Sequence, residues 1–208
     1  LSIRRQRQMC IRDRILTLPL KPIYDEFGIN RVIVSTMQAL SGAGYPGVAS
    51  MDIVDNVIPF IPKEEEKMQN EALKIMGSLS KPADFKVSAS CHRVPTLDGH
   101  MEAVFVGLER EAYTESVVDA LERFVGEPQR LKLPTAPTQP VVVRREEDRP
   151  QTRLDRMEGG GMSVVVGRVR KDHVIGGVKF IALGHNTIRG AAGCAILNAE
   201  YLKTQKYI

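Results

Sequence analysis

The 208-residue chain is 43% hydrophobic and 26% charged, with 12 prolines and 17 glycines. This composition is typical of a globular domain and excludes collagen-like, disordered and disulfide-rich classes. The formal charge of +4 arises in residues 1–14, which hold five Arg and one Asp, so the rest of the chain is neutral. A neutral body disfavours nucleic acid or an anionic membrane as partner, and no apolar run reaches the roughly 20 residues of a membrane helix.

The cysteine content indicates the redox environment of the protein, and the first residues of the chain form a separate segment. Cys10, Cys91 and Cys194 are odd in number and lack metal-ligand spacing, which supports neither a disulfide framework nor a metal site. We therefore expect a reducing, cytoplasmic environment. Residues 1–14 show no apolar periodicity, and we expect them to be a foreign or disordered head that packs against nothing.

In the first half of the chain the patterns predict three strands and a helix. The β-branched run Arg31–Thr36 predicts a buried strand that ends in a glycine-rich loop. Residues 63–77 combine acids in the first turn, apolar side chains at helical spacing and a final glycine, which predicts a helix. Phe85–Val94 and His100–Leu108 alternate around a Pro/Asp/Gly turn, and we expect them to pair as a β-hairpin.

The second half mixes loops, strands and helices. Residues 114–126 predict a helix with one apolar face, and the proline-rich residues 131–161 predict a mostly long surface loop. Residues 161–170 and 176–184 predict two strands joined by a turn, followed by a helix of small residues over 190–202. Strands in hairpins with helices between them favour an α+β fold on a mixed or mostly antiparallel sheet, undivided by a linker.

Three glycines after the first strand, Gly42, Gly44 and Gly47, have the G-x-G-x-x-G spacing of a dinucleotide site. Such a site needs a helix that begins at the glycines and directs its N-terminus at a pyrophosphate. The following residues have no helical apolar stripe and soon reach prolines. We therefore interpret this segment as a loop.

Two pairs of side chains have both a functional and a structural interpretation. Arg93 and His100 flank one turn, where Arg suits a carboxylate and His an acid or base, although both are compatible with purely structural roles. Glu64 and Lys67 share a helix face and either pair with each other in solvent or leave Lys67 to contact a phosphate near the helix N-terminus.

Two cysteines have a structural interpretation. Cys91 and its neighbour His92 point to opposite faces of a strand and so cannot easily form a dyad. We expect Cys91 and Cys194 to be small core residues.

Taken together, four segments resemble aspartate-semialdehyde dehydrogenase of the archaeal and fungal branch; they are LKPIYDEFGINRVIVSTMQALSGAGYPGV, EEEKMQNEALKI, CHRVPTLDGHMEAVFV and HNTIRGAAGCAILNAE. The resemblance implies a fold like the C-terminal domain of the glyceraldehyde-3-phosphate dehydrogenase-like superfamily. It implies a catalytic and dimerisation domain over 15–208, with the N-terminal Rossmann domain missing. It also implies that 187–208 form a helix returning to that NADP-binding domain, and that Asn186 opens the segment that approaches the nicotinamide.

The family reduces aspartyl phosphate to aspartate semialdehyde with NADPH, through a cysteine thioester, in the biosynthesis of lysine, threonine, methionine and isoleucine. The resemblance therefore implies small-molecule substrates, a homodimer or homotetramer, and no nucleic acid or membrane partner. Malonyl-CoA reductase, a relative with the same thioester chemistry, is the alternative. A nucleic-acid binder that uses the Arg-rich head is a third hypothesis, but no aromatic stacking platform accompanies those arginines.

The resemblance assigns a role to each matching side chain. His100 is the acid/base catalyst, and Gln38 orients the substrate beside the nucleophile. Arg93 binds the substrate carboxylate, Lys67 faces the phosphate, and Glu64 faces the substrate amine.

The family's nucleophilic cysteine does not transfer to this sequence. Its position corresponds to Ile11, and Cys10 stands one residue away in an unrelated context. We therefore expect the chain to be inactive by itself.

Overall fold

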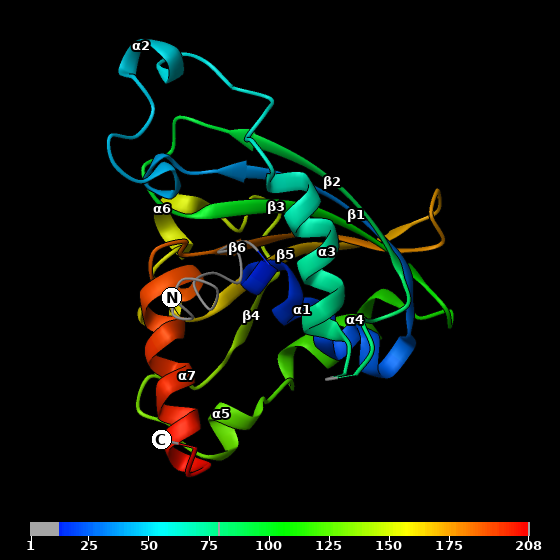
Figure 1. The fold of residues 1–208 in the computed structure, drawn as a ribbon. Helices are drawn as coiled ribbons and strands as arrows, with labels where there is room; N and C mark the ends of the chain where they lie inside the picture. Colours follow the sequence, from blue (N-terminus) through cyan, green and yellow to red (C-terminus); the bar gives the residue numbers. More distant parts are fainter. Residues whose placement is uncertain (1–12, 79, 208) are drawn as a thin grey trace.

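The computed structural model describes residues 13–78 and 80–207 (Figure 1). The helices and helical turns, in chain order, are α1 (Asp13–Phe27), η1 (Leu40–Ala43), α2 (Ser50–Ile53), α3 (Glu64–Met76), α4 (Thr114–Glu122), α5 (Glu127–Arg130), α6 (Thr152–Asp155), η2 (Glu158–Gly161), η3 (Ile188–Ala192) and α7 (Gly193–Thr204). The strands are β1 (Ile29–Gln38), β2 (Lys86–Arg93), β3 (His100–Leu108), β4 (Val141–Arg144), β5 (Val164–Asp172) and β6 (Gly177–Gly184). Within these ranges no helix is long and apolar enough to cross a bilayer.

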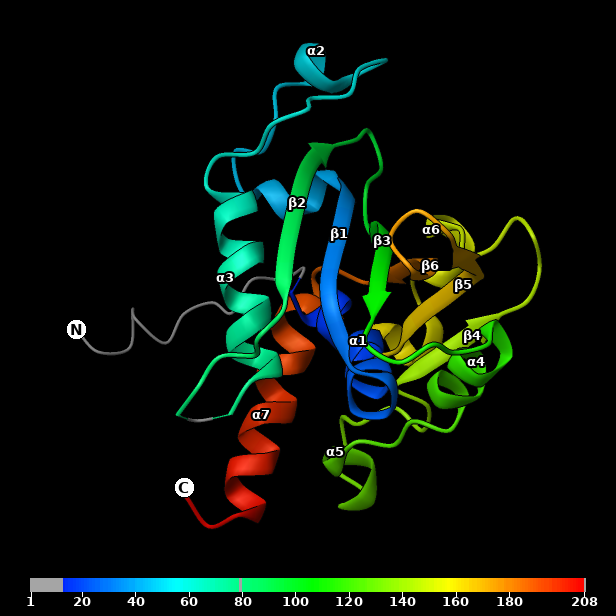
Figure 2. The same ribbon diagram turned by 90° about the vertical axis from the view of Figure 1, so that its right-hand side faces the viewer.

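The strands form one six-stranded mixed sheet in the order β2-β1-β3-β6-β5-β4. The pairs β1–β2 and β4–β5 are parallel, and the three central pairs are antiparallel. Helices α1 and α3 lie against one face of the sheet (Figure 2). The predicted α+β class with a mostly antiparallel sheet is confirmed, as are the strand after residue 28, the helix after Lys63 and the pair β5–β6.

The predicted hairpin between β2 and β3 is wrong. Strand β1 lies between them, parallel to β2 and antiparallel to β3. A parallel pair needs a long crossover connection, and the segment of residues 39–85 with α3 supplies it. The turn signal after Arg93 marks a reversal of direction correctly, but it does not determine which strand becomes the neighbour.

Helix α1 was not predicted, because Pro19 and Pro22 lie inside it and proline removes a backbone donor from a helix. Burial accounts for the helix, since Ile15, Leu20 and Ile23 are fully enclosed in the aliphatic core. Tertiary packing outweighs the local preference of the prolines here.

Most of the predicted head, residues 1–12, lies outside the described residues. Asp13 and Arg14 form the start of α1. Nη1 of Arg14 donates to the carbonyl oxygen of Gly190 at 2.8 Å. The expectation that residues up to 14 contact nothing is therefore wrong for Arg14. Helix α1 begins at Asp13, before the first apolar residue of the helix, Ile15, and so includes Arg14.

The predicted surface loop over 131–161 is more ordered than the proline pattern indicates. Strand β4 pairs with β5, and the Asp155 side chain is enclosed and accepts hydrogen bonds from the Arg149 guanidinium, from Arg144 and from the Gln151 amide. Burial opposes ionisation of this carboxyl, but the bonds from Arg149 and Gln151 outweigh it and lower the pKa of Asp155.

Candidate active site

Three predicted site residues, Gln38, Arg93 and His100, lie in one row on the helix-covered face of the sheet. The β1–β2 register places Gln38 opposite Arg93. The β1–β3 register pairs Met37 with Met101, and one further step brings Gln38 beside His100. Directly paired residues on neighbouring strands face the same side, and the three side chains are at most 6% exposed. The structure thus brings together residues from three separate motifs.

The peptide group of Ala39 connects two members of the row. Its N–H donates to Nδ1 of His100 at 3.2 Å, and its carbonyl oxygen accepts a bond from Nη1 of Arg93 at 2.7 Å. Because Nδ1 acts as acceptor, this hydrogen bond assigns the proton of the neutral imidazole to Nε2. The backbone at the end of β1 therefore fixes both the Arg93 fork and the His100 tautomer.

Gly42 explains the glycine-rich segment. A Cβ atom at this position would lie 2.8 Å from Cε1 of His100 and 3.1 Å from Nη1 of Arg93. The absence of a side chain lets the loop after β1 close over both groups. Helix α2 is a single turn, which agrees with the interpretation of this segment as a loop.

Asn186 joins two loops of the site. Its side chain is fully buried, its Oδ1 accepts the Gly99 N–H at 2.8 Å, and its Nδ2 donates to Oγ of Ser41 at 2.7 Å. Gly99 precedes His100, and Ser41 lies in η1 next to Gly42. Each polar atom of the amide thus makes one hydrogen bond inside the chain, and one N–H of Nδ2 and one lone pair of Oδ1 have no partner among the described residues.

Glu64 and Lys67 lie in the first turns of α3. Nζ of Lys67 is 3.5 Å from Oε1 of Glu64, with side chains 45% and 11% exposed. The adjacent Glu65 accepts the Cys91 N–H at 3.0 Å, which anchors the start of α3 to β2 two residues before Arg93. Glu64 is the described partner of Lys67. The pair lies at the same end of the sheet as the row of Gln38, Arg93 and His100.

Glu102 was missed by the sequence analysis. It is fully buried, two residues after His100 on the same face, and its register partners are Thr36 and Ala182. An acidic residue at a core-facing position of an alternating strand was the available signal.

Arg156 was also missed. Its Nη1 donates to the carbonyl oxygen of Asp98 at 3.2 Å and so supports the turn before His100. The nearby His185 is mostly enclosed, and burial, with a smaller effect from Arg156, lowers its pKa although Asp98 acts in the opposite direction.

The two remaining cysteines in the described ranges are buried, as predicted. Cys91 points into the core, while His92 on the opposite face lies within hydrogen-bonding distance of Ser35 and the Thr36 carbonyl. The two do not form a dyad. Across residues 13–78 and 80–207, no cluster of three His, Cys, Asp or Glu side chains could hold a metal ion.

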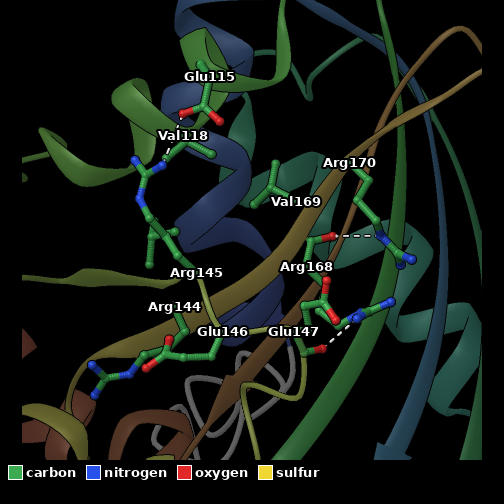
Figure 3. A pocket seen from close by; sticks show the side chains of 10 residues that line it. Glu115, Val118, Arg144, Arg145, Glu146, Glu147, Arg168, Val169 and Arg170 are labelled. Carbon is green, nitrogen blue, oxygen red and sulfur yellow. Dashed lines mark hydrogen bonds and ion pairs between the residues drawn. The ribbon is translucent and has the colours of Figure 1, made fainter.

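A separate surface pocket of about 330 Å³ lies among α4, β4 and β5 (Figure 3). Arg145 in its wall pairs with Glu115 at 3.1 Å and Glu122 at 3.3 Å. Nη1 of Arg168 donates to the Glu147 carbonyl. These groups bind one another across the pocket, and none of the predicted site residues lines it.

Residues 20–189 match the family described as semialdehyde dehydrogenase, dimerisation domain. The aspartate-semialdehyde dehydrogenase of Methanothermobacter thermautotrophicus is 57% identical over 192 residues, covering 90% of this chain and 55% of that protein. The one from Archaeoglobus fulgidus is 54% identical, covering 93% and 56%. The malonyl CoA reductase (NADP) of Metallosphaera sedula is 42% identical, covering 92% and 56%.

A solved structure agrees with these matches. The crystal structure of aspartate semialdehyde dehydrogenase with NADP from Candida albicans superimposes with a TM-score of 0.86 at 39% identity, covering 96% of this chain and 57% of that one. The chain spans about half the length of the curated relatives it matches.

Proposed function

Because the chain belongs to the semialdehyde dehydrogenase family through its dimerisation domain, we propose that it is the catalytic and dimerisation portion of an aspartate-semialdehyde dehydrogenase. The proposed reaction is the NADPH-dependent reductive dephosphorylation of L-aspartyl 4-phosphate to L-aspartate 4-semialdehyde. The observation that carries the proposal is the buried row of Gln38, Arg93 and His100 held by the Ala39 peptide. A fixed guanidinium beside a fixed imidazole suits an anionic substrate that must exchange a proton.

Arg93 binds the substrate α-carboxylate in this proposal. Its guanidinium is enclosed and anchored at one nitrogen by the Ala39 carbonyl, so binding costs little side-chain entropy. Gln38 orients the acyl group, since the bond from its Nε2 to Oγ1 of Thr36 at 3.2 Å holds the carboxamide in place.

His100 handles the proton. With Nδ1 accepting from Ala39, Nε2 carries the proton of the neutral imidazole, and we propose that this proton passes to the oxygen that develops negative charge in the thiohemiacetal-like transition state. Lys67 contacts the phosphate through its half-exposed ammonium group, and Glu64 contacts the substrate amine. The distance of 3.5 Å between Lys67 Nζ and Glu64 Oε1 indicates a weak ion pair, so a substrate can compete with each residue for the other.

In the reductive direction NADPH would supply the hydride, and the Candida albicans structure is of that enzyme with NADP. In this proposal the described residues bind the substrate and transfer the proton, and the Asn186 amide makes one hydrogen bond at each of its polar atoms. A contact between Asn186 and the nicotinamide therefore remains a prediction.

The test is a chimera that joins the upstream half of the Methanothermobacter relative, where the family resemblance places the nucleophilic cysteine, to residues 15–208. We expect phosphate-dependent, NADP-linked oxidation of aspartate semialdehyde, and no activity from the 208-residue chain. His100→Ala should lower kcat by about 100-fold or more. Lys67→Ala should raise KM for phosphate more than KM for the aldehyde, while Lys74→Ala, an exposed lysine of the same helix, should change neither.

The same chimera tests the alternative substrate. Reduction of malonyl-CoA in preference to aspartyl phosphate would support the malonyl-CoA reductase hypothesis. That hypothesis is suggested by the 42% identity to the malonyl CoA reductase of Metallosphaera sedula. Activity with neither acyl donor would contradict both assignments.

The proposed homodimer uses the sheet face opposite α1 and α3. Ile33, Phe105 and Lys179 are register neighbours on this face, and Ile33 is 43% exposed. Nearby Met37 and Met101 are also paired there and only partly buried. An apolar sheet face left open in a dimerisation domain fits a second copy of the same face. Ile33→Lys should shift the chain to monomer in analytical ultracentrifugation, whereas Val174→Lys in the exposed β5–β6 turn should not.

A further inference from the structure

Glu102 on β3 is a buried carboxyl group to which the proposed reaction gives no role. Its side chain is fully enclosed. Across the helix-covered face of β1, β2, β3 and β6, the register places three acidic or basic side chains among apolar and neutral polar ones; they are Glu102, Arg93 and His100. Glutamate is almost never fully buried unless it is paired, so its place on this face calls for an explanation.

Glu102 lies directly beside the row of site residues. It follows His100 by two residues on the same strand, so both side chains point to the same face. At a rise of about 3.3 Å per residue their Cα atoms are about 6.6 Å apart. The register partner of Glu102 is Thr36, whose Oγ1 accepts the bond from Nε2 of Gln38 at 3.2 Å. The carboxyl group therefore lies one step below the row, toward the core.

Arg93 opposes the uptake of a proton by His100. Nε2 of His100 and Nη1 of Arg93 lie 3.0 Å and 3.1 Å from the position that a Cβ on Gly42 would occupy, so the two nitrogens are at most about 6 Å apart. The guanidinium keeps its charge at every accessible pH. A like charge at this distance disfavours the imidazolium form, and the enclosed setting strengthens the effect. A negative charge nearby would offset it.

Other elements at this end of the sheet also bring charged or titratable groups. They are Glu64, Glu65 and Lys67 on α3, Asp98 before β3, Arg156 after α6 and His185 after β6. Lys67 and Glu64 already pair with each other. From α1 the apolar Ile15 lies over Gly184, the register partner of His100. Glu102 is thus the carboxyl group on the enclosed strand face itself.

We propose that Glu102 is a positioning residue that acts through its charge, with an ionised carboxylate that offsets Arg93 at the His100 imidazole. A carboxylate and a guanidinium on one enclosed face also compensate each other's burial. This balance does not depend on which acyl donor the site takes. Its consequence for kcat rests on the proposed function, in which His100 transfers the proton.

The experiment follows the 208-residue chain by NMR with 13C-labelled glutamate and histidine. The Glu102 carboxyl should be ionised at pH 7. Glu102→Gln should lower the pH at which the His100 ring is half-protonated by about one unit, a tenfold change in proton affinity, as expected for a charge about 7 Å away in a partly screened interior. Glu102→Asp keeps the charge and should titrate close to the parent. Glu109→Gln is the matched control, since this exposed glutamate follows the far end of β3.

Four outcomes would overturn the proposal. They are a protonated Glu102 carboxyl at pH 7, an unchanged His100 titration in Glu102→Gln, equal shifts in the Gln and Asp variants, which would indicate altered packing, and a larger shift in Glu64→Gln, which would place the counter-charge on α3. If Glu102→Gln fails to fold, the labelled carboxyl of the parent chain still decides. In the chimera, the limb of the kcat–pH profile that reports His100 should move with the ring titration. A shifted titration with an inactive chimera would contradict the proposed function and leave this inference standing.

Discussion

Replacing Asn186 with alanine removes two hydrogen bonds that connect the loops of the candidate site. The Gly99 N–H loses its acceptor at 2.8 Å, and Ser41 loses its donor at 2.7 Å. An unsatisfied buried donor costs about 1–3 kcal/mol, and loss of a neutral hydrogen bond about 1 kcal/mol. We therefore expect Asn186→Ala to lower the free energy of unfolding by about 2–4 kcal/mol, a large part of the 5–15 kcal/mol typical of a domain.

Urea unfolding of the 208-residue chain measures this loss, and amide hydrogen exchange reports on Gly99 directly. Exchange at Gly99 should accelerate in Asn186→Ala. Ser41→Ala is the control, since it removes one partner and leaves the Gly99 bond intact; it should cost about 1 kcal/mol and leave exchange at Gly99 slow. A cost for Asn186→Ala no greater than that for Ser41→Ala, with unchanged protection of Gly99, would refute the argument that this side chain holds the two loops together.

Three further perturbations test other parts of the structure. Gly42→Ala should shift the ring resonances of His100 and destabilise the chain by about 1–3 kcal/mol, the usual cost of overpacking, because the new Cβ meets Cε1 at 2.8 Å; unchanged spectra would contradict this. Asp155→Ala should cost about 2–3 kcal/mol in urea unfolding, below the full value for a buried pair, because its partner Arg149 is 21% exposed. Burial lowers the pKa of His185 below its ordinary value of 6.5, so its contribution to stability is complete above that pH and is lost as the pH falls through the lower, folded-state pKa. His185→Gln should therefore flatten the pH dependence of the urea midpoint below about pH 6.5, whereas an unchanged slope would show that another group titrates there.

The sequence motifs indicated three candidate residues that the structure places in one row, but one of the arguments for their proximity was incorrect. Arg93 and His100 were expected to meet across a hairpin. They meet instead across β1, which lies between their strands and contributes Gln38 to the same row. The short connection of residues 94–99 keeps the two strand ends at one edge of the sheet in either topology, which is why the predicted proximity of Arg93 and His100 was correct.

Elements whose signals are local could be predicted from the amino-acid pattern alone. The β-branched run of β1, the acid-rich start and glycine stop of α3, and the alternating β5 and β6 follow from backbone sterics and side-chain periodicity within a few residues. The resemblance of four motifs in a fixed order, likewise readable in the chain, indicated the family to which the domain belongs.

Features that depend on contacts between distant residues could be seen only in the folded chain. Burial of Ile15 and Leu20 forms α1 despite two prolines, because the free energy of a packed core exceeds a local propensity. The insertion of β1 between β2 and β3 and the amide of Asn186 between Gly99 and Ser41 also depend on the assembled fold. Hydrogen bonding and desolvation act on what lies nearby in space, and a linear pattern does not contain that information.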